Sequence, residues 1–237
     1  MKNLKLNTIY PAFMGEVNKY GIGAPCTFVR LAGCNLRCYE KTKGTLCDTP
    51  EALTLSCGKD VSVDYIVSSV KSIGKKLVCL TGGEPLMQDV TELLEALVKA
   101  GCYVVVETNG TKSIEKYQHI KNVSFVVDYK CCSTGENSKM DSTNYPLMGP
   151  DDYLKFVVDD YKDLNQLQEF IGAYPYFKGR IAVGAFWGAE LKYMDLIQFV
   201  QESKLPIYLN MQTHKMACLY DECKKESKLN IFVPREL

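Results

Sequence analysis

The sequence has no excess of either charge and no long apolar run. Its 28 basic residues are balanced by 28 acidic residues, so the formal net charge is zero. No attraction of the whole chain therefore favours nucleic acid or an anionic membrane as a partner. The apolar runs are too short for a membrane span, and the first residues lack the apolar core of a signal peptide. We expect a cytoplasmic protein that binds neither nucleic acid nor membrane.

The chain also lacks internal repeats, linkers and low-complexity segments. Its 237 residues are 46% hydrophobic and 24% charged, which is typical of one globular unit with a single core. We therefore expect one domain over residues 1–237. Its C-terminal tail, about 216–237, has a mixed polar and apolar pattern that predicts no particular element.

Disulfide bonds are not expected, although the chain has 11 cysteines. The count is odd and no export signal is present. Cys79 and Cys102 lie in apolar, strand-like runs, where a free cysteine is usually a small buried hydrophobic side chain. Cys26 and Cys57 flank the loop described next, and we expect neither to bind metal.

Three cysteines gather on one loop, over residues 33–49. An apolar strand ends at Gly33, and Cys34, Cys38 and Cys47 follow it. Thiolates are soft ligands, and several on one loop suit zinc or an iron–sulfur cluster. A structural zinc site has four ligands. A cubane cluster held by three thiolates leaves one iron open to a small molecule, so this loop is the candidate metal-binding segment.

Short apolar strands alternate with amphipathic helices along most of the chain. Residues 1–25 are rich in glycine and proline, which predicts a loop. We expect strands over 27–32, 77–80, 103–106, 123–127, 154–158, 181–185 and 207–210, helices over 62–73, 88–100, 162–172 and 189–202, and a long loop over 131–151. This alternation predicts an α/β fold with a parallel sheet. The unusual residues that follow the strands should then share one rim, as in α/β barrels.

The motifs on this rim resemble those of a known superfamily. Cys-x3-Cys with a further cysteine, and Gly-Gly-Glu-Pro at 82–85, are similar to the radical S-adenosylmethionine (SAM) superfamily. Within it, the runs at 28–38 and 47–49, Glu107-Thr-Asn-Gly, Asp128-Tyr-Lys and Gln-x-His-Lys at 212–215 resemble the 7-carboxy-7-deazaguanine synthase family. The resemblance spans most of the chain and implies a partial (β/α)6-type barrel.

The resemblance also implies a reaction and its cofactors. Members of the family contract 6-carboxy-5,6,7,8-tetrahydropterin to 7-carboxy-7-deazaguanine with loss of ammonia, on the route to queuosine and other 7-deazapurines. They hold a [4Fe–4S] cluster, SAM and Mg²⁺, accept an electron from a donor such as flavodoxin, and are usually homodimers. We expect the same of this chain.

The resemblance assigns these roles to residues of this sequence. Cys34, Cys38 and Cys47 are the expected cluster ligands, and Thr49 the expected Mg²⁺ ligand. The residues expected at SAM are Gly82, Gly83, Glu84, Thr108, Asp128, Lys130 and Ser133. Those expected at the pterin are Gly15, Glu16, Arg30, Thr81, Gln212 and His214. These residue types suit the roles, since glycine admits close backbone approach, carboxylate suits a guanidine-like edge, and arginine suits a carboxylate.

The sequence departs from the family pattern at three places. Eight residues separate Cys38 from Cys47, where two are usual, and the polar stretch 39–46 is expected to bulge into solvent. Met14 replaces a glutamine often found before Gly-Glu. Residues 185–187, Ala-Phe-Trp, replace a common Gln-Pro pair at a SAM contact.

Two other functions fit part of this pattern. A radical SAM activase that generates a glycyl radical on a protein partner would need the three cysteines, but not Glu16, Arg30 and Thr49 as a set. A non-catalytic zinc or iron–sulfur interaction module would also use the cysteine loop. Metal analysis and a test of SAM cleavage separate these alternatives.

Overall fold

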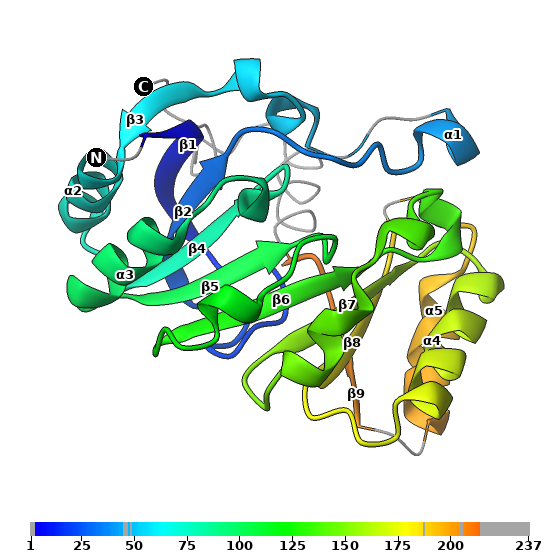
Figure 1. Cartoon of the computed structure of the whole chain (residues 1–237). Coiled ribbons are helices and arrows are strands. Elements are labelled where there is room, and N and C mark those ends of the chain that lie inside the picture. The colour runs from blue at the N-terminus through cyan, green and yellow to red at the C-terminus, as the bar shows by residue number, and fades with distance from the viewer. Residues whose placement is uncertain (1–2, 45–46, 48, 187, 204–205, 214–237) are drawn as a thin grey trace, which may run out of the picture.

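A nine-stranded curved sheet forms the frame of the computed structural model, which describes residues 3–44, 47, 49–186, 188–203 and 206–213 (Figure 1). The strand order in the described residues is β3-β1-β2-β4-β5-β6-β7-β8-β9. The strands are β1 (Asn3–Phe13), β2 (Pro25–Leu31), β3 (Lys59–Ser62), β4 (Leu77–Gly82), β5 (Tyr103–Thr108), β6 (Val123–Tyr129), β7 (Tyr153–Val158), β8 (Arg180–Ala185) and β9 (Ile207–Leu209). Neighbouring strands from β2 to β9 are all parallel.

Helices α2 (Val63–Ile73), α3 (Thr91–Lys99), α4 (Tyr161–Ala173) and α5 (Tyr193–Glu202) cover the outer side of this sheet (Figure 1). The short helix α1 (Glu40–Lys43) lies apart from them, on the loop that follows β2. Helix α2 begins where the Ser62 side chain accepts a hydrogen bond from the Tyr65 amide, and it ends at Gly74 in the left-handed region. Helix α4 begins in the same way at Asp160. These caps explain why the predicted ends of both helices lie close to the observed ends.

The two faces of the sheet build two cores. Val104 and Val106 of β5 pack with the helices in the larger, outer core. Val105, between them, packs in a smaller core inside the barrel with Cys79 and Met14. Successive side chains of a strand point to opposite faces, so each parallel strand supplies both cores. The inner core fills the barrel near the amino ends of the strands and leaves room at the carboxyl ends.

The α/β fold with a partial barrel is confirmed, and every strand and helix predicted from the sequence is present with its ends moved by a few residues. The predicted loop over residues 1–25 is wrong for β1, which pairs antiparallel with β2 and β3. Leu4 and Leu6 are fully buried and alternate with exposed or half-buried residues. Apart from Pro11, the glycines and prolines of this segment all follow β1, and they concealed this alternation.

Loop contacts close the gap between the first and the last strands of the partial barrel. The Val17 amide donates to the Asn210 side chain (2.9 Å), and the Thr213 amide donates to the Gly15 carbonyl (3.0 Å). These closing contacts join the loop after β1 to the chain after β9. His214 and the predicted tail lie outside the described residues. No helix in the described part of the chain has the length and hydropathy of a membrane-spanning segment.

Candidate active site

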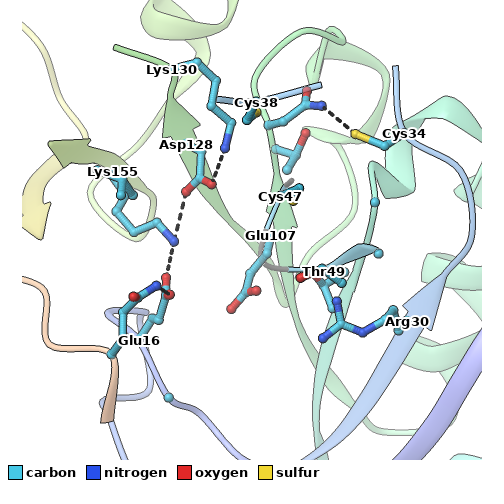
Figure 2. Close-up of a pocket in the computed structure, with 18 of the residues that line it drawn as sticks. Glu16, Arg30, Cys34, Cys38, Cys47, Thr49, Glu107, Asp128, Lys130 and Lys155 are labelled. Atoms are coloured by element: carbon cyan, nitrogen blue, oxygen red, sulfur yellow. Dashed lines mark hydrogen bonds and ion pairs between the residues drawn. The ribbon is translucent and has the colours of Figure 1, made fainter. Parts of the chain in front are cut away.

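A cavity of about 390 Å³ lies at the carboxyl ends of the strands (Figure 2). It brings together residues from the loop after β1 and from β2, β4, β5, β6, β7 and the chain after β9. The predicted site residues that line it are Gly15, Glu16, Arg30, Cys34, Cys38, Cys47, Thr49, Thr81, Gly82, Gly83, Thr108, Asp128, Lys130 and Gln212. The expectation that the strand-end motifs share one rim is therefore correct for this set.

Two predicted SAM residues do not line the cavity. The Ser133 hydroxyl donates to Asp163 (2.5 Å), and the following residue, Thr134, lies on the wall instead. Glu84 is completely buried behind the wall. The predicted substrate residue His214 falls outside the described residues, so its role stays a prediction.

The cysteine loop is held in place by backbone hydrogen bonds. The Gly33 amide donates to the Ala52 carbonyl (2.8 Å), and the Cys34 amide donates to the Leu53 carbonyl (3.0 Å). Gly33 has a φ of 98°, which favours glycine at the point where β2 turns into the loop. Cys34, Cys38 and Cys47 are all partly exposed. Burial raises the pKa of Cys38, and nearby Lys130 opposes this rise.

Tyr39 and Lys43, in the insertion between Cys38 and Cys47, contact other parts of the protein. The prediction of a solvent bulge over 39–46 is wrong for Tyr39, which is 6% exposed and stacks on Phe186 with ring centroids 4.1 Å apart. Helix α1 follows, and Lys43 forms an ion pair with Asp159 (2.5 Å). These contacts attach the insertion to residues near the ends of β7 and β8. Tyr39 and Phe186 both line the cavity, so the departure at 185–187 places an aromatic ring there.

Glu84 links two of the strand-end loops. One of its oxygens accepts from the Leu86 amide (2.9 Å) and the Thr108 hydroxyl (2.7 Å), and the other accepts from the Asn109 amide (2.6 Å). Burial raises the pKa of this carboxyl, and the three donors offset the rise only in part. In these contacts Glu84 holds the Gly-Gly-Glu-Pro loop against the loop after β5. Contact between Glu84 and the ammonium of SAM stays a prediction.

Charged side chains line a further part of the cavity, and one of them, Lys130, lies beside Cys38 (Figure 2). The Lys155 ammonium contacts the carboxylates of Glu16 and Asp128, the latter at 2.9 Å. Asp128 also accepts from Lys130 (2.8 Å), and Glu16 accepts from the Gln212 side chain (2.7 Å). Burial favours the neutral acid, but Lys130 and Lys155 outweigh it and lower the pKa of Asp128 to about 2. The network therefore stays charged at neutral pH.

Arg30 and Glu107 reach the cavity from β2 and β5. The Arg30 guanidinium lies over the Phe28 ring, 5.1 Å from its centroid. Within the described residues, no acidic side chain forms an ion pair with this guanidinium. Burial and the neighbouring Glu16 raise the pKa of Glu107.

Sequence reasoning did not assign Lys155, Glu107, Tyr39 and Phe186 to the site. Lys155 carried a signal, since it is a charged residue inside the apolar run 154–158. Glu107 opens the strand-end motif 107–110, but the motif alone does not indicate that its side chain enters the cavity. Tyr39 and Phe186 both lie in stretches that depart from the family pattern, but nothing in the sequence indicates that their rings stack on each other.

Comparisons with known proteins decide the family. The Radical SAM superfamily model matches residues 29–129. The chain is 33% identical over 216 residues to a 7-carboxy-7-deazaguanine synthase of Methanospirillum hungatei, covering 90% of this chain and 84% of that protein. It is 34% identical over 214 residues to one of Clostridium acetobutylicum, covering 85% and 91%. The chain belongs to the 7-carboxy-7-deazaguanine synthase family.

A solved structure agrees with this family at the level of the fold. The crystal structure of QueE from Escherichia coli matches with a TM-score of 0.70 at 21% identity, covering 88% of this chain and 93% of that chain. The family is part of the radical SAM superfamily, whose enzymes use a [4Fe–4S] cluster and SAM. These are therefore the cofactors that the family implies here.

The residues present fit a cluster with SAM beside it. Three cysteine side chains line one cavity, yet within the described residues no three histidine, cysteine or acidic side chains converge closely enough to bind one metal ion. A cluster needs no such convergence, because each thiolate binds a different iron. Gly83 adds a second observation. A Cβ there would lie 2.7 Å from the Cβ of Cys34 and 2.6 Å from two carbonyl oxygens, so only glycine fits beside the cysteine loop.

Proposed function

We propose that this chain is a radical SAM 7-carboxy-7-deazaguanine synthase that converts 6-carboxy-5,6,7,8-tetrahydropterin to 7-carboxy-7-deazaguanine and ammonia. The observation that carries the proposal is one cavity lined by three cysteine thiols and by carboxylates, lysines and an arginine that are buried or half-buried. Its volume of about 390 Å³ suits small molecules rather than a protein segment. This supports a synthase over an activase of a glycyl-radical enzyme.

At the thiol end, Cys34, Cys38 and Cys47 would hold the cluster. Gly82 and Gly83 have no Cβ, so SAM could lie close to their backbone. When bound, the cluster and SAM supply the 5′-deoxyadenosyl radical that starts the reaction. The protein's own task is to orient both groups and to keep the cavity closed around them. Tyr39 and Phe186 support this second task, since they stack on each other at the wall.

At the opposite end, Arg30 and Glu16 would bind the pterin. The Arg30 guanidinium suits the substrate carboxylate through a bidentate pair, and Glu16 suits the guanidine-like edge. Lys155 and Gln212 hold the Glu16 carboxylate within the cavity. Thr49, which also lines the cavity, is the proposed Mg²⁺ ligand beside the substrate carboxylate, because Mg²⁺ prefers oxygen ligands and usually keeps waters.

The family pattern in the sequence supports three further parts of this proposal. Residues 1–237 act as one radical SAM domain, two copies form a homodimer, and a small electron-transfer protein such as flavodoxin reduces the cluster. Size-exclusion chromatography with light scattering tests the dimer. Reduction of the cluster by flavodoxin, followed by visible absorbance, tests the donor.

The deciding experiment is an anaerobic assay. The protein is reconstituted with iron and sulfide and supplied with reductant, SAM, Mg²⁺ and 6-carboxytetrahydropterin, and products are identified by mass spectrometry. We expect 7-carboxy-7-deazaguanine. Formation of 5′-deoxyadenosine without this product would keep the radical chemistry and reject the substrate. Zinc in place of iron, with no cleavage of SAM, would support the interaction module instead.

A further inference from the structure

Glu107 differs from the other acidic residues at the cavity in its partners. Glu16 and Asp128 both contact ammonium groups, and Glu84 accepts three hydrogen bonds behind the wall. Within the described residues, the Glu107 carboxylate contacts no ammonium or guanidinium group, and its hydrogen-bond partner is the thiol of Cys79. Among the described carboxylates that line the cavity, Glu107 is therefore the one without an ion pair to stabilise its charged form.

The position of Glu107 places it at the middle of the cavity. It is the residue before the end of β5, on the inner face that Val105 also shares. In Figure 2 its carboxylate points into the open space between Glu16 and Arg30. If those two residues bind opposite ends of a pterin, as proposed above, the Glu107 carboxylate faces the ring atoms between them.

We propose that Glu107 is a catalytic residue that carries the proton in the ammonia-releasing half of the reaction. This inference rests on the proposed function. The substrate and product differ by one molecule of ammonia, so nothing is oxidised or reduced overall. In this half of the reaction the ring contraction has already broken one carbon–nitrogen bond, so the nitrogen is an amino group on a single carbon. The remaining carbon–nitrogen bond breaks with its electron pair on nitrogen, which takes the proton of the Glu107 carboxyl and leaves as ammonia. The resulting carboxylate removes a proton from the adjacent ring carbon, whose electrons form the new double bond. Glu107 is then protonated again and no other co-reactant is needed.

The surroundings of Glu107 favour its protonated form. Burial raises its pKa, Glu16 and Asp128 raise it further, and Lys155 lowers it, with a net rise. The charged and titratable groups on the surrounding elements are Glu16 on the loop after β1, Cys26 and Arg30 on β2, Cys79 on β4, Asp128 on β6 and Lys155 on β7. Because the acid form gives the proton, product formation should fall as the pH rises through the pKa of Glu107.

The test compares Glu107→Gln with wild type in the anaerobic assay, using ring-deuterated 6-carboxytetrahydropterin. We expect the variant to move deuterium into 5′-deoxyadenosine or SAM at close to the wild-type rate. Formation of 7-carboxy-7-deazaguanine should fall by about 10²–10⁴-fold, the usual contribution of a general acid. Its remaining activity should lose the high-pH decline of the wild type. Glu107→Asp, which keeps the acid on a shorter side chain, should restore part of the product formation. Glu95→Gln, an exposed carboxylate on α3, is the matched control and should behave as wild type.

A binding measurement keeps the role of Glu107 separate from substrate binding and folding. The fluorescence of 6-carboxypterin, the oxidised analogue, reports its affinity without turnover, and we expect Glu107→Gln to bind it within a few-fold of wild type. Loss of this binding, or equal loss of deuterium transfer and product, would show a structural or binding role and overturn the proposal. Unchanged product formation by the variant would overturn it as well. A wild-type protein that forms no product from the pterin would reject the proposed function itself, and this inference with it.

Discussion

The two ends of the cavity are built in different ways. At the thiol end, which comprises Cys34, Cys38, Cys47 and Gly83, the backbone sets the positions, through hydrogen bonds such as that from the Glu84 amide to the Gly33 carbonyl (2.8 Å). At the charged end, which comprises Glu16, Asp128 and Lys155 with Lys130 extending from it toward Cys38, buried and half-buried side chains hold one another. The thiol end thus depends on the absence of side-chain bulk, whereas the charged end depends on the presence of every partner.

The largest effect is expected at the thiol end. Cys34→Ala removes one of the proposed cluster ligands, so the reconstituted protein should lose the cluster and its activity together. Iron and sulfide analysis and the visible absorbance of the cluster check this. Cys57→Ala is the control, because Cys57 is exposed and does not line the cavity. A full cluster in Cys34→Ala would contradict the assignment.

The next effect concerns the charged end. Lys155→Met leaves Glu16 without its ammonium partner and Asp128 with one ammonium partner instead of two. Loss of one partner of a buried ion pair typically lowers the free energy of unfolding by about 3–5 kcal/mol. Urea unfolding measures the change in free energy of unfolding. Lys116→Met is the matched control, since Lys116 pairs with Asp89 at the surface, where such a pair contributes about 0–1 kcal/mol. Equal losses in the two variants would mean that the buried pairs do not organise this end.

A smaller effect is expected from added bulk at the thiol end. Gly83→Ala places a methyl group against backbone oxygens and Cys34, and overpacking of this kind costs about 1–3 kcal/mol. SAM affinity should fall roughly ten- to a hundredfold, as measured by equilibrium dialysis of the cluster-loaded protein. Gly172→Ala on α4 is the control, because a Cβ there meets nothing within 4 Å. Wild-type affinity in Gly83→Ala would show that the loop has more room than the structure gives it.

The smallest effect is expected between the two ends. Thr49→Ala should keep the cluster but require about tenfold more Mg²⁺ for half-maximal product formation, in line with typical losses from altered metal surroundings. A Mg²⁺ titration of the anaerobic assay measures this. Behaviour like the wild type at every Mg²⁺ concentration would remove Thr49 from the metal site.

The same contrast explains what the sequence predicts about the site. The thiol end is visible in the sequence because cysteines and glycines at short spacing create it. The charged end is not, because the Lys155–Glu16 pair joins residues 139 positions apart, and nothing in the run 154–158 names the partner of the lysine. The sequence predicts that the residues after the strands are neighbours. Only the structure shows which carboxylates form ion pairs and which does not.

The fold shows a similar division. Strands β4 to β8 were predictable because each is a short apolar run that ends in a polar or glycine-containing motif. Strand β1 was missed because a glycine- and proline-rich stretch follows its alternating residues. The short helix α1 was missed because tertiary contacts stabilise it, among them the pair between Lys43 and Asp159. A helix of four residues has little stability of its own, so no local pattern predicts it.

The closing contacts have a consequence for how the protein is made. Gln212 and Glu16 are 196 residues apart, and contacts of such long range form late in folding. Chains are synthesised from the N-terminus at about 5–20 residues per second, so Cys34 leaves the ribosome on the order of ten seconds before Thr213 does. During that interval the cysteine loop exists without the wall that closes the barrel beside it. Newly made chains should therefore be most sensitive to oxidation before β9 has docked, and a lower rate of translation should lengthen this vulnerable period.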